Sequence, residues 1–414
     1  QLISNKETSP EWLEWVAGFY YLDQKVGFPL NRLSAGGLDF SDGTIGGLIP
    51  IPDFAAAFYQ ALADAGIPLT DGFSLALVSL QEAKASAYFG QATAHLTDWM
   101  YVTLGGRYQD EKRTVIESSG NLANADGSIT PIPGLNFGQP SKSDTNFSPK
   151  VVLGFTPWDA SLFYGSWSKG FKSGTFNTVN VYNEPEYIKP EEVTSAELGT
   201  KITLAGGQLQ FNAAAFDTDI KNQQVQFISL LAGGAVQLEN AAKVSIRGGE
   251  IELTYRPDWN TGGVASASVT YLDSKYDSYP NASGFTQPSG LYNFGRGDNT
   301  GNRTIRTPEW SGNLSLNQVF GFSAGDLELG LTGFFSSDLF FQASNADISK
   351  QKSYTTLDGQ VSFLHTASNV RITVLGRNLT DERYALTQFH TDAGVQHVLA
   401  PPRAFGVRLD WAFD

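Results

Sequence analysis

Cations and aromatic side chains lie close together at several points of this sequence, in stretches rich in Gly, Ser and Asn. Side chains of both kinds on one concave surface suit an anionic, aromatic ligand, because the cation supplies charge and the ring supplies stacking surface. The candidate ligand-binding residues are Trp167, Lys169, Lys172, Asn177, Tyr292, Arg296, Arg303, Arg306, Phe340, Phe341, Arg383, Tyr384 and His390.

Histidine offers less chemistry. His390 and His397 stand seven residues apart with Asp392 between them, and imidazoles with a carboxylate could ligate a metal or haem. That spacing matches no recognised ligand pattern, so we predict no metal site and no cofactor. A hydrolase would need a converging Ser, His and carboxylate, yet no G-x-S-x-G motif is present and there is no Cys, so we predict no catalytic residue.

The elements that must position these residues follow a period of two. In "PPRAFGVRLDWAFD" (Pro401–Asp414), one parity holds Phe405, Val407, Leu409, Trp411 and Phe413, and the other holds Arg408 and Asp410. This alternation predicts a strand. About fourteen such strands, plus a stub at residues 1–5, are expected along the chain.

The connections between the expected strands alternate strictly between short and long. The short ones include "TD", "TPWDA", "AGG" and "HTASN", whereas the long ones cover roughly residues 22–82, 111–145, 172–192, 221–242, 277–307, 341–354 and 381–401. Long loops confined to one end of an up-and-down sheet are typical of a transmembrane antiparallel β-barrel, with short periplasmic turns and long extracellular loops. Inside the longest loop, the Ala-rich stretch 53–66 predicts a short helix.

Composition agrees with an all-β membrane barrel. Aromatic residues make up 13% of the chain and charged residues only 17%, while the net charge of −14 disfavours a nucleic-acid partner. Lipid would penalise charges on the outward parity, so we expect seven of them to face the lumen: Arg107, Glu250, Glu252, Arg371, Arg377, Arg408 and Asp410. They would form either a solvated ion network or a polar path for ligand. Aromatics among the ligand candidates have the interfacial girdle as their alternative role.

Several stretches, in order along the chain, resemble the barrel of TonB-dependent outer-membrane receptors. They are "SKGFKSGTFN" (Ser168–Asn177), "EEVTSAELGTKITLAGGQLQFNAAAFDTDIKNQQ" (Glu191–Gln224), "NAAKVSIRGGEIELTYRP" (Asn240–Pro257), "RTPEWSGNLSL" (Arg306–Leu316), "LGRNLTDERYA" (Leu375–Ala385) and "PPRAFGVRLDWAF" (Pro401–Phe413). The resemblance implies a Gram-negative outer-membrane receptor that binds a scarce ligand, with a ferric catecholate or hydroxamate siderophore expected first. Its implied partners are the TonB–ExbB–ExbD complex and outer-membrane lipid and lipopolysaccharide.

The family's barrel has 22 strands and encloses a plug. The resemblance therefore implies that residues 1–414 are the C-terminal part of the barrel, and that the plug, the TonB box and the first strands precede Gln1. A smaller closed barrel is the alternative, because an open sheet in lipid would leave two unpaired edges. Two other functions stay open: a passive porin or structural barrel, expected to show an inward constriction loop with clustered charge, and an outer-membrane hydrolase, expected to show a Ser–His pair.

Overall fold

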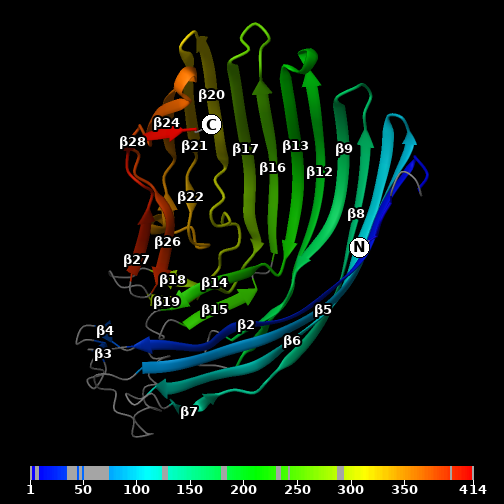
Figure 1. The fold of residues 1–414 in the computed structure, drawn as a ribbon. Helices are drawn as coiled ribbons and strands as arrows, with labels where there is room; N and C mark the ends of the chain where they lie inside the picture. Colours follow the sequence, from blue (N-terminus) through cyan, green and yellow to red (C-terminus); the bar gives the residue numbers. More distant parts are fainter. Residues whose placement is uncertain are drawn as a thin grey trace.

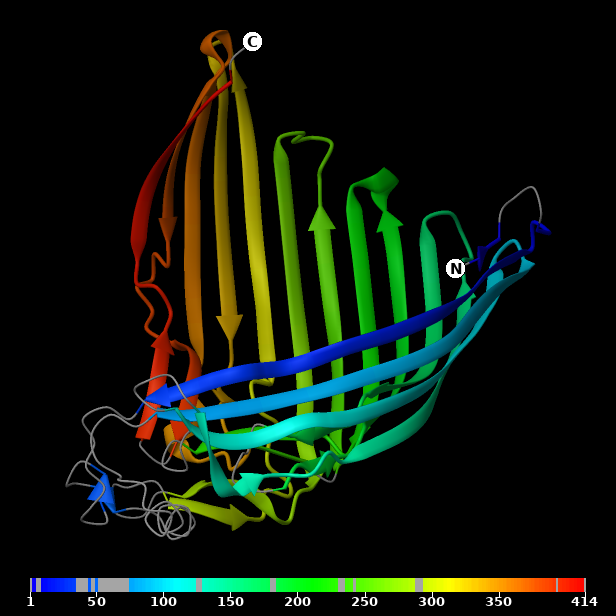
Figure 2. The same ribbon diagram turned by 60° about the horizontal axis from the view of Figure 1, so that its bottom comes forward.

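A computed structural model describes residues 2–4, 9–34, 44–45, 49–50, 74–123, 129–178, 184–229, 235–240, 243–286, 293–391 and 394–412. Long antiparallel strands form one strongly curved sheet, drawn in Figures 1 and 2. Within the described part of the chain, no helix combines the length and the apolar character needed to cross a bilayer.

The sheet follows the chain order without crossovers. Its path is β1 (Leu2–Ile3), β2 (Leu13–Ser34), β5 (Ser74–Thr97), β6 (Met100–Ala123), β8 (Ser141–Phe155), β9 (Ser161–Lys172), β12 (Glu191–Leu204), β13 (Leu209–Lys221), β16 (Lys243–Tyr255), β17 (Gly263–Ser278), β20 (Trp310–Phe322), β21 (Gly325–Ser336), β24 (Tyr354–His365), β25 (Val370–Arg377) and β28 (Ala404–Trp411). A further strand, β7 (Ile129–Asn136), pairs with β6 off this path. The prediction of fourteen strands and a stub is confirmed for the described residues.

Most of the long connections carry a small hairpin of their own, which the sequence did not predict. The hairpins are β3 (Thr44–Ile45) with β4 (Ile49–Pro50), β10 (Thr175–Asn177) with β11 (Glu186–Ile188), β14 (Gln224–Ser229) with β15 (Ala235–Asn240), β18 (Ala282–Thr286) with β19 (Asn293–Gly297), β22 (Leu339–Phe340) with β23 (Lys350–Gln351), and β26 (Ala385–Thr391) with β27 (Gly394–Leu399). Labelled hairpins gather at one end of the sheet in Figure 1, the end opposite the short turns. Short 3-10 turns are η1 (Ala205–Gly207), η2 (Asp347–Ser349) and η3 (Thr366–Ser368).

Two of the loops predicted from the sequence are shorter in the structure. Strand β2 continues to Ser34 and β5 begins at Ser74, so much of 22–82 is strand, and β6 runs on to Ala123 through the expected loop 111–145. Beyond the level of the membrane both faces of a strand can be polar, so backbone pairing continues there without the apolar alternation that sequence reading relies on. The expected helix at 53–66 lies outside the described residues.

The sheet has two chemically distinct faces. Cross-strand partners share a face, and following them from strand to strand places all seven charges expected in the lumen on one face. We call this the inner face. The opposite, outer face carries exposed apolar side chains, among them Leu104, Val151, Trp167, Leu198, Ile251, Val269, Trp310, Val361, Phe405, Val407, Leu409 and Trp411. This division is that of a transmembrane barrel wall.

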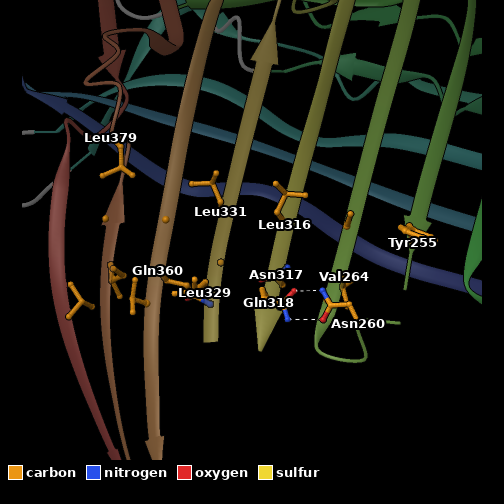
Figure 3. Close-up of a pocket in the computed structure, with 18 of the residues that line it drawn as sticks. Tyr255, Asn260, Val264, Leu316, Asn317, Gln318, Leu329, Leu331, Gln360 and Leu379 are labelled. Carbon is orange, nitrogen blue, oxygen red and sulfur yellow. Dashed lines mark hydrogen bonds between the residues drawn. The ribbon is translucent and has the colours of Figure 1, made fainter. Parts of the chain in front are cut away.

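One depression on the sheet has a volume of about 660 Å³. Figure 3 draws residues that line it, among them Leu316, Leu329 and Leu331. Those three side chains belong to the outer-face row of their strands. Near one end, Asn260 and Gln318 exchange two amide hydrogen bonds of 2.6 and 2.9 Å. Because most of its lining is apolar and belongs to the outer face, this depression is part of the lipid-contact surface rather than a ligand site.

Candidate ligand-binding site at the loop end of the barrel

A cluster of cations and rings forms where the β17–β20 loop meets the β21–β24 loop. The guanidinium of Arg303 lies 5.7 Å from the centre of the Phe340 ring, and the ammonium of Lys350 lies 5.5 Å from the same ring. Asp338 accepts from both cations, at 3.0 Å from Arg303 and 3.3 Å from Lys350. Burial opposes ionisation of this carboxyl, but the two cations outweigh it and hold the pKa of Asp338 below its ordinary value.

A second cation–ring pair adjoins the first. The Arg306 guanidinium lies 5.8 Å from the Phe341 ring and donates to the Thr387 hydroxyl on β26, a contact between residues 81 positions apart. Arg306 has a φ of 58°, an uncommon conformation for a residue with a side chain. We call Arg303, Arg306, Asp338, Phe340, Phe341 and Lys350 the mouth cluster.

Backbone contacts fix this arrangement. The Asn345 amide accepts from the Arg303 N–H at 2.8 Å and donates to the Arg303 carbonyl at 3.0 Å, so one side chain pairs with a backbone unit as a strand would. The Arg306 N–H donates to the Phe340 carbonyl at 2.8 Å. The cations are therefore placed by two loops at once, and their side chains stay 30 to 39% exposed at Arg303 and Lys350.

Four of the predicted ligand residues, Arg303, Arg306, Phe340 and Phe341, are thus brought together. Sequence reasoning missed Asp338 and Lys350. The only sequence signal for Asp338 is its position two residues before Phe340, and Lys350 follows across a loop of unremarkable composition. Tyr384 lies farther along, stacked on Tyr354 with ring centres 4.1 Å apart.

The other predicted ligand residues are scattered. Trp167 and Lys169 occupy the outer-face row of β9, with the Lys169 ammonium 5.7 Å from the Trp167 ring. An outward position suits the interfacial girdle, the alternative role of the aromatics among the ligand candidates. Lys172 ends β9 on the inner face, and Asn177 is buried. Arg296 donates to the Asn281 carbonyl and Arg383 is exposed, whereas Tyr292 lies outside the described residues.

His390 is buried in the β26–β27 hairpin. Its Nε2 lies 2.9 Å from the Gln388 side-chain oxygen, and its Nδ1 has no partner among the described residues. Burial first, and then the neighbouring His397, lowers the pKa of His390 to about 4, so the imidazole is neutral at physiological pH. Asp392 falls outside the described residues, and the part of the chain described contains no group of three metal-ligating side chains.

One Ser–His contact bears on the hydrolase alternative. His365 Nδ1 lies 2.8 Å from Ser368 Oγ across the short η3 turn, at the end of the barrel away from the mouth cluster. No carboxylate contacts this imidazole in the described residues, and both partners are exposed. The contact closes a turn and does not assemble a nucleophile with its base and acid.

A second polar site lies on the inner wall, where sequence reasoning expected a loop. Glu111 on β6 is only 7% exposed and accepts from Gln109 at 2.9 Å, Arg113 at 2.8 Å and Ser173 at 2.5 Å. Ser173 belongs to the β9–β12 loop, so that loop folds onto the inner face. We call residues 173–178 and 184–190 of this loop the strap. A run of inward alanines on β5, Ala83, Ala85 and Ala87, was the one sequence signal that something packs there.

The fold and the divided faces define an outer-membrane β-barrel. Residues 8–379 match the family described as "TonB dependent receptor-like, beta-barrel", so the chain belongs to that family of Gram-negative outer-membrane proteins. The ferric yersiniabactin uptake receptor FyuA from Yersinia pestis is similar, with a TM-score of 0.69 at 20% identity over 96% of this chain and 51% of that one.

The siderophore receptor PiuA from Acinetobacter baumannii gives a TM-score of 0.63 at 18% identity, covering 98% of this chain and 53% of its own. The ferric preacinetobactin receptor BauA from the same organism gives 0.58 at 18% identity, covering 96% and 50%. The chain therefore spans about half the length of these structures. At such identities the likeness establishes the fold. No curated protein shows significant sequence similarity to the chain.

Proposed function

We propose that the chain is the ligand-receiving barrel region of a receptor that imports a ferric siderophore with energy supplied through TonB. The mouth cluster carries this proposal. Three cations and two rings converge at the loop end, and only one carboxylate, Asp338, offsets the charge within the cluster. Such a surface suits an anionic ferric complex with aromatic or extended π groups. One similar structure is named a siderophore receptor, and two others are named as receptors for ferric yersiniabactin and ferric preacinetobactin, which makes this ligand class the first to test.

The test is uptake of ⁵⁵Fe supplied as a panel of ferric catecholate and hydroxamate siderophores to cells producing the full receptor. Substituting Arg303→Met or Phe340→Leu should lower the apparent affinity for the imported complex about tenfold, since each change removes a cation or a ring from the cluster. Lys352→Met is the matched control, because Lys352 is exposed two residues from Lys350 and outside the cluster. Equal uptake by all variants, or uptake that resists a protonophore, would overturn the proposal.

A passive barrel is the second candidate, and the strap favours it. An inward loop with clustered charge is the feature expected of a porin constriction, and Ser173 of the strap bonds to Glu111, which Gln109 and Arg113 also contact. Energy coupling distinguishes the two candidate functions. After the proton gradient is collapsed, passive diffusion of the ferric complex would continue, whereas TonB-coupled import would stop.

A further inference from the structure

Arg303 and Lys350 share the carboxylate of Asp338, but Arg303 is held by many more bonds. One terminal nitrogen of Arg303, Nη1, donates to the Asp338 carboxylate at 3.0 Å. The other, Nη2, donates to two main-chain carbonyls, that of Thr307 at 3.0 Å and that of Asp338 at 2.8 Å. Both hydrogens of Nη2 are therefore used, and the guanidinium joins the β17–β20 loop to the β21–β24 loop.

Lys350 is held much less firmly. Its ammonium lies 3.3 Å from the Asp338 carboxylate and makes no other ion pair or hydrogen bond with the residues that the structure describes. An ammonium has three N–H donors, so two remain for another acceptor. The Lys350 side chain is 39% exposed. Lys350 can therefore exchange its partner, whereas Arg303 cannot do so without opening the junction between the two loops.

The donors of Lys350 stand beside an aromatic ring. The β22–β23 hairpin places Lys350 directly opposite Phe340, and the ammonium lies 5.5 Å from the ring centre. Cross-strand partners share one face of a hairpin, so charge and ring are presented together. A ligand with an anionic oxygen on an aromatic ring, as in a ferric catecholate, matches both features.

We propose that Lys350 is the cation that contacts the imported ferric complex, and that Arg303 is a positioning residue. An anionic oxygen of the ligand takes the place of the Asp338 carboxylate at the Lys350 ammonium. The carboxylate is not left unpaired, because the Arg303 guanidinium still neutralises it. The cluster thereby favours anionic complexes such as ferric tris-catecholates over neutral ferric tris-hydroxamates. This inference rests on the proposed function for its ligand.

Binding of each ferric complex of the panel to the purified full receptor tests the role of Lys350. Lys350→Met should weaken binding of anionic complexes about tenfold, and its affinity should change less with NaCl concentration. Lys350→Arg should bind within about threefold of the parent, because it restores a charged donor. Lys352→Met is the matched control and should bind like the parent. Parent-like binding by Lys350→Met, or tighter binding of the neutral complexes by the parent receptor, would overturn the proposal.

Amide exchange in the ligand-free receptor tests the role of Arg303. The Arg306 N–H donates to the Phe340 carbonyl and so joins the same two loops. Arg303→Met and Arg303→Lys should both accelerate its exchange about tenfold, because neither side chain has the planar fork that bonds both carbonyls. Arg303→Lys should also lose affinity for anionic complexes although it keeps the charge. Lys350→Met should leave the exchange unchanged, and equal acceleration in that variant would overturn the proposal.

The two kinds of failure are distinguishable. If the parent receptor neither binds nor imports any complex of the panel, the proposed function fails, and the ligand of this inference fails with it. Uptake by the parent together with equal binding by Lys350→Met would overturn the inference alone. The exchange measurement needs no ligand, so it decides the division of roles between Arg303 and Lys350 in either case.

Discussion

The strap and the mouth cluster are loop structures at the same end of the barrel, but different interactions hold them. The strap is held by two carboxamide clamps, Gln81 on the Phe176 backbone and the more exposed Asn240 on the Lys189 backbone, and by side chains such as Phe176 and Thr178 that are 5% and 2% exposed. In the mouth cluster, backbone contacts place the two loops, but the side chains are paired by charge and stay partly exposed. A carboxamide paired with backbone fixes one conformation, whereas a partly exposed cation keeps donors free for a ligand. The strap therefore has a structural role and the mouth cluster a role in recognition.

The largest effect is expected at Gly174. Substitution by Ala places a Cβ on the Tyr187 hydroxyl and should cost the strap about 3 kcal/mol of local stability, because overpacking displaces the Tyr187 ring. Amide exchange at Phe176 would accelerate accordingly. Gly170→Ala is the control, since a Cβ there meets nothing within 4 Å. If the two variants exchange alike at Phe176, the first arm of the strap is not packed against Tyr187 in its second arm.

The next effect is expected at Gln81. Replacement by Leu removes the acceptor of the Phe176 N–H and one of two donors to the Phe176 carbonyl, which keeps the Thr178 N–H. The change should cost about 2 kcal/mol, because partly buried polar groups lose hydrogen bonds. Exchange at Phe176 and Thr178 measures this loss. Gln91→Leu, on the same strand and face but exposed, should change nothing there. A strap insensitive to Gln81 would mean that the clamp does not hold it.

Acid should destabilise the β26–β27 hairpin that contains His390, but not the strap. The pKa of His390 is lowered to about 4, so the unfolded hairpin takes up a proton near pH 6.5 while the folded one does not. The stability of the β26–β27 hairpin is therefore fully present above pH 6.5 and falls as the pH drops toward 4, by about 3 kcal/mol. After correction for the intrinsic pH dependence of amide exchange, the protection of the β26 amides should fall over this range, and a His390→Gln variant should lack the dependence. The side-chain amides that clamp the strap do not titrate, and an equal loss of protection at Phe176 would contradict this difference.

The smallest effect concerns the mouth cluster. Asp338→Asn removes a partly exposed ion pair and should lower loop stability by less than about 1 kcal/mol. Raising NaCl from 50 to 500 mM should shrink the difference between variant and parent, measured by amide exchange at Phe340, because salt screens exposed charges. Strap amides should show no salt dependence. Salt-dependent exchange in the strap would contradict the difference between the two regions.

Strand alternation made most of the barrel wall predictable. A period of two assigns each side chain to a face whatever the strand's neighbours, so the inward position of Glu250 and Arg408 followed from parity alone. The cations and rings of the mouth cluster were found by residue type. Their meeting was not, because Arg303 contacts Asp338 across 35 positions and Arg306 contacts Thr387 across 81.

The sequence by itself therefore determined the strand number, the two faces and the family. Only the tertiary structure decided that the β9–β12 loop lies on the wall instead of above it. That decision depends on contacts such as Ser79 with Thr178, 99 positions apart, and on the space that Gly174 leaves for Tyr187. Alternation is a local property carried by every strand, whereas a loop's resting place is set by whichever distant polar groups it can satisfy.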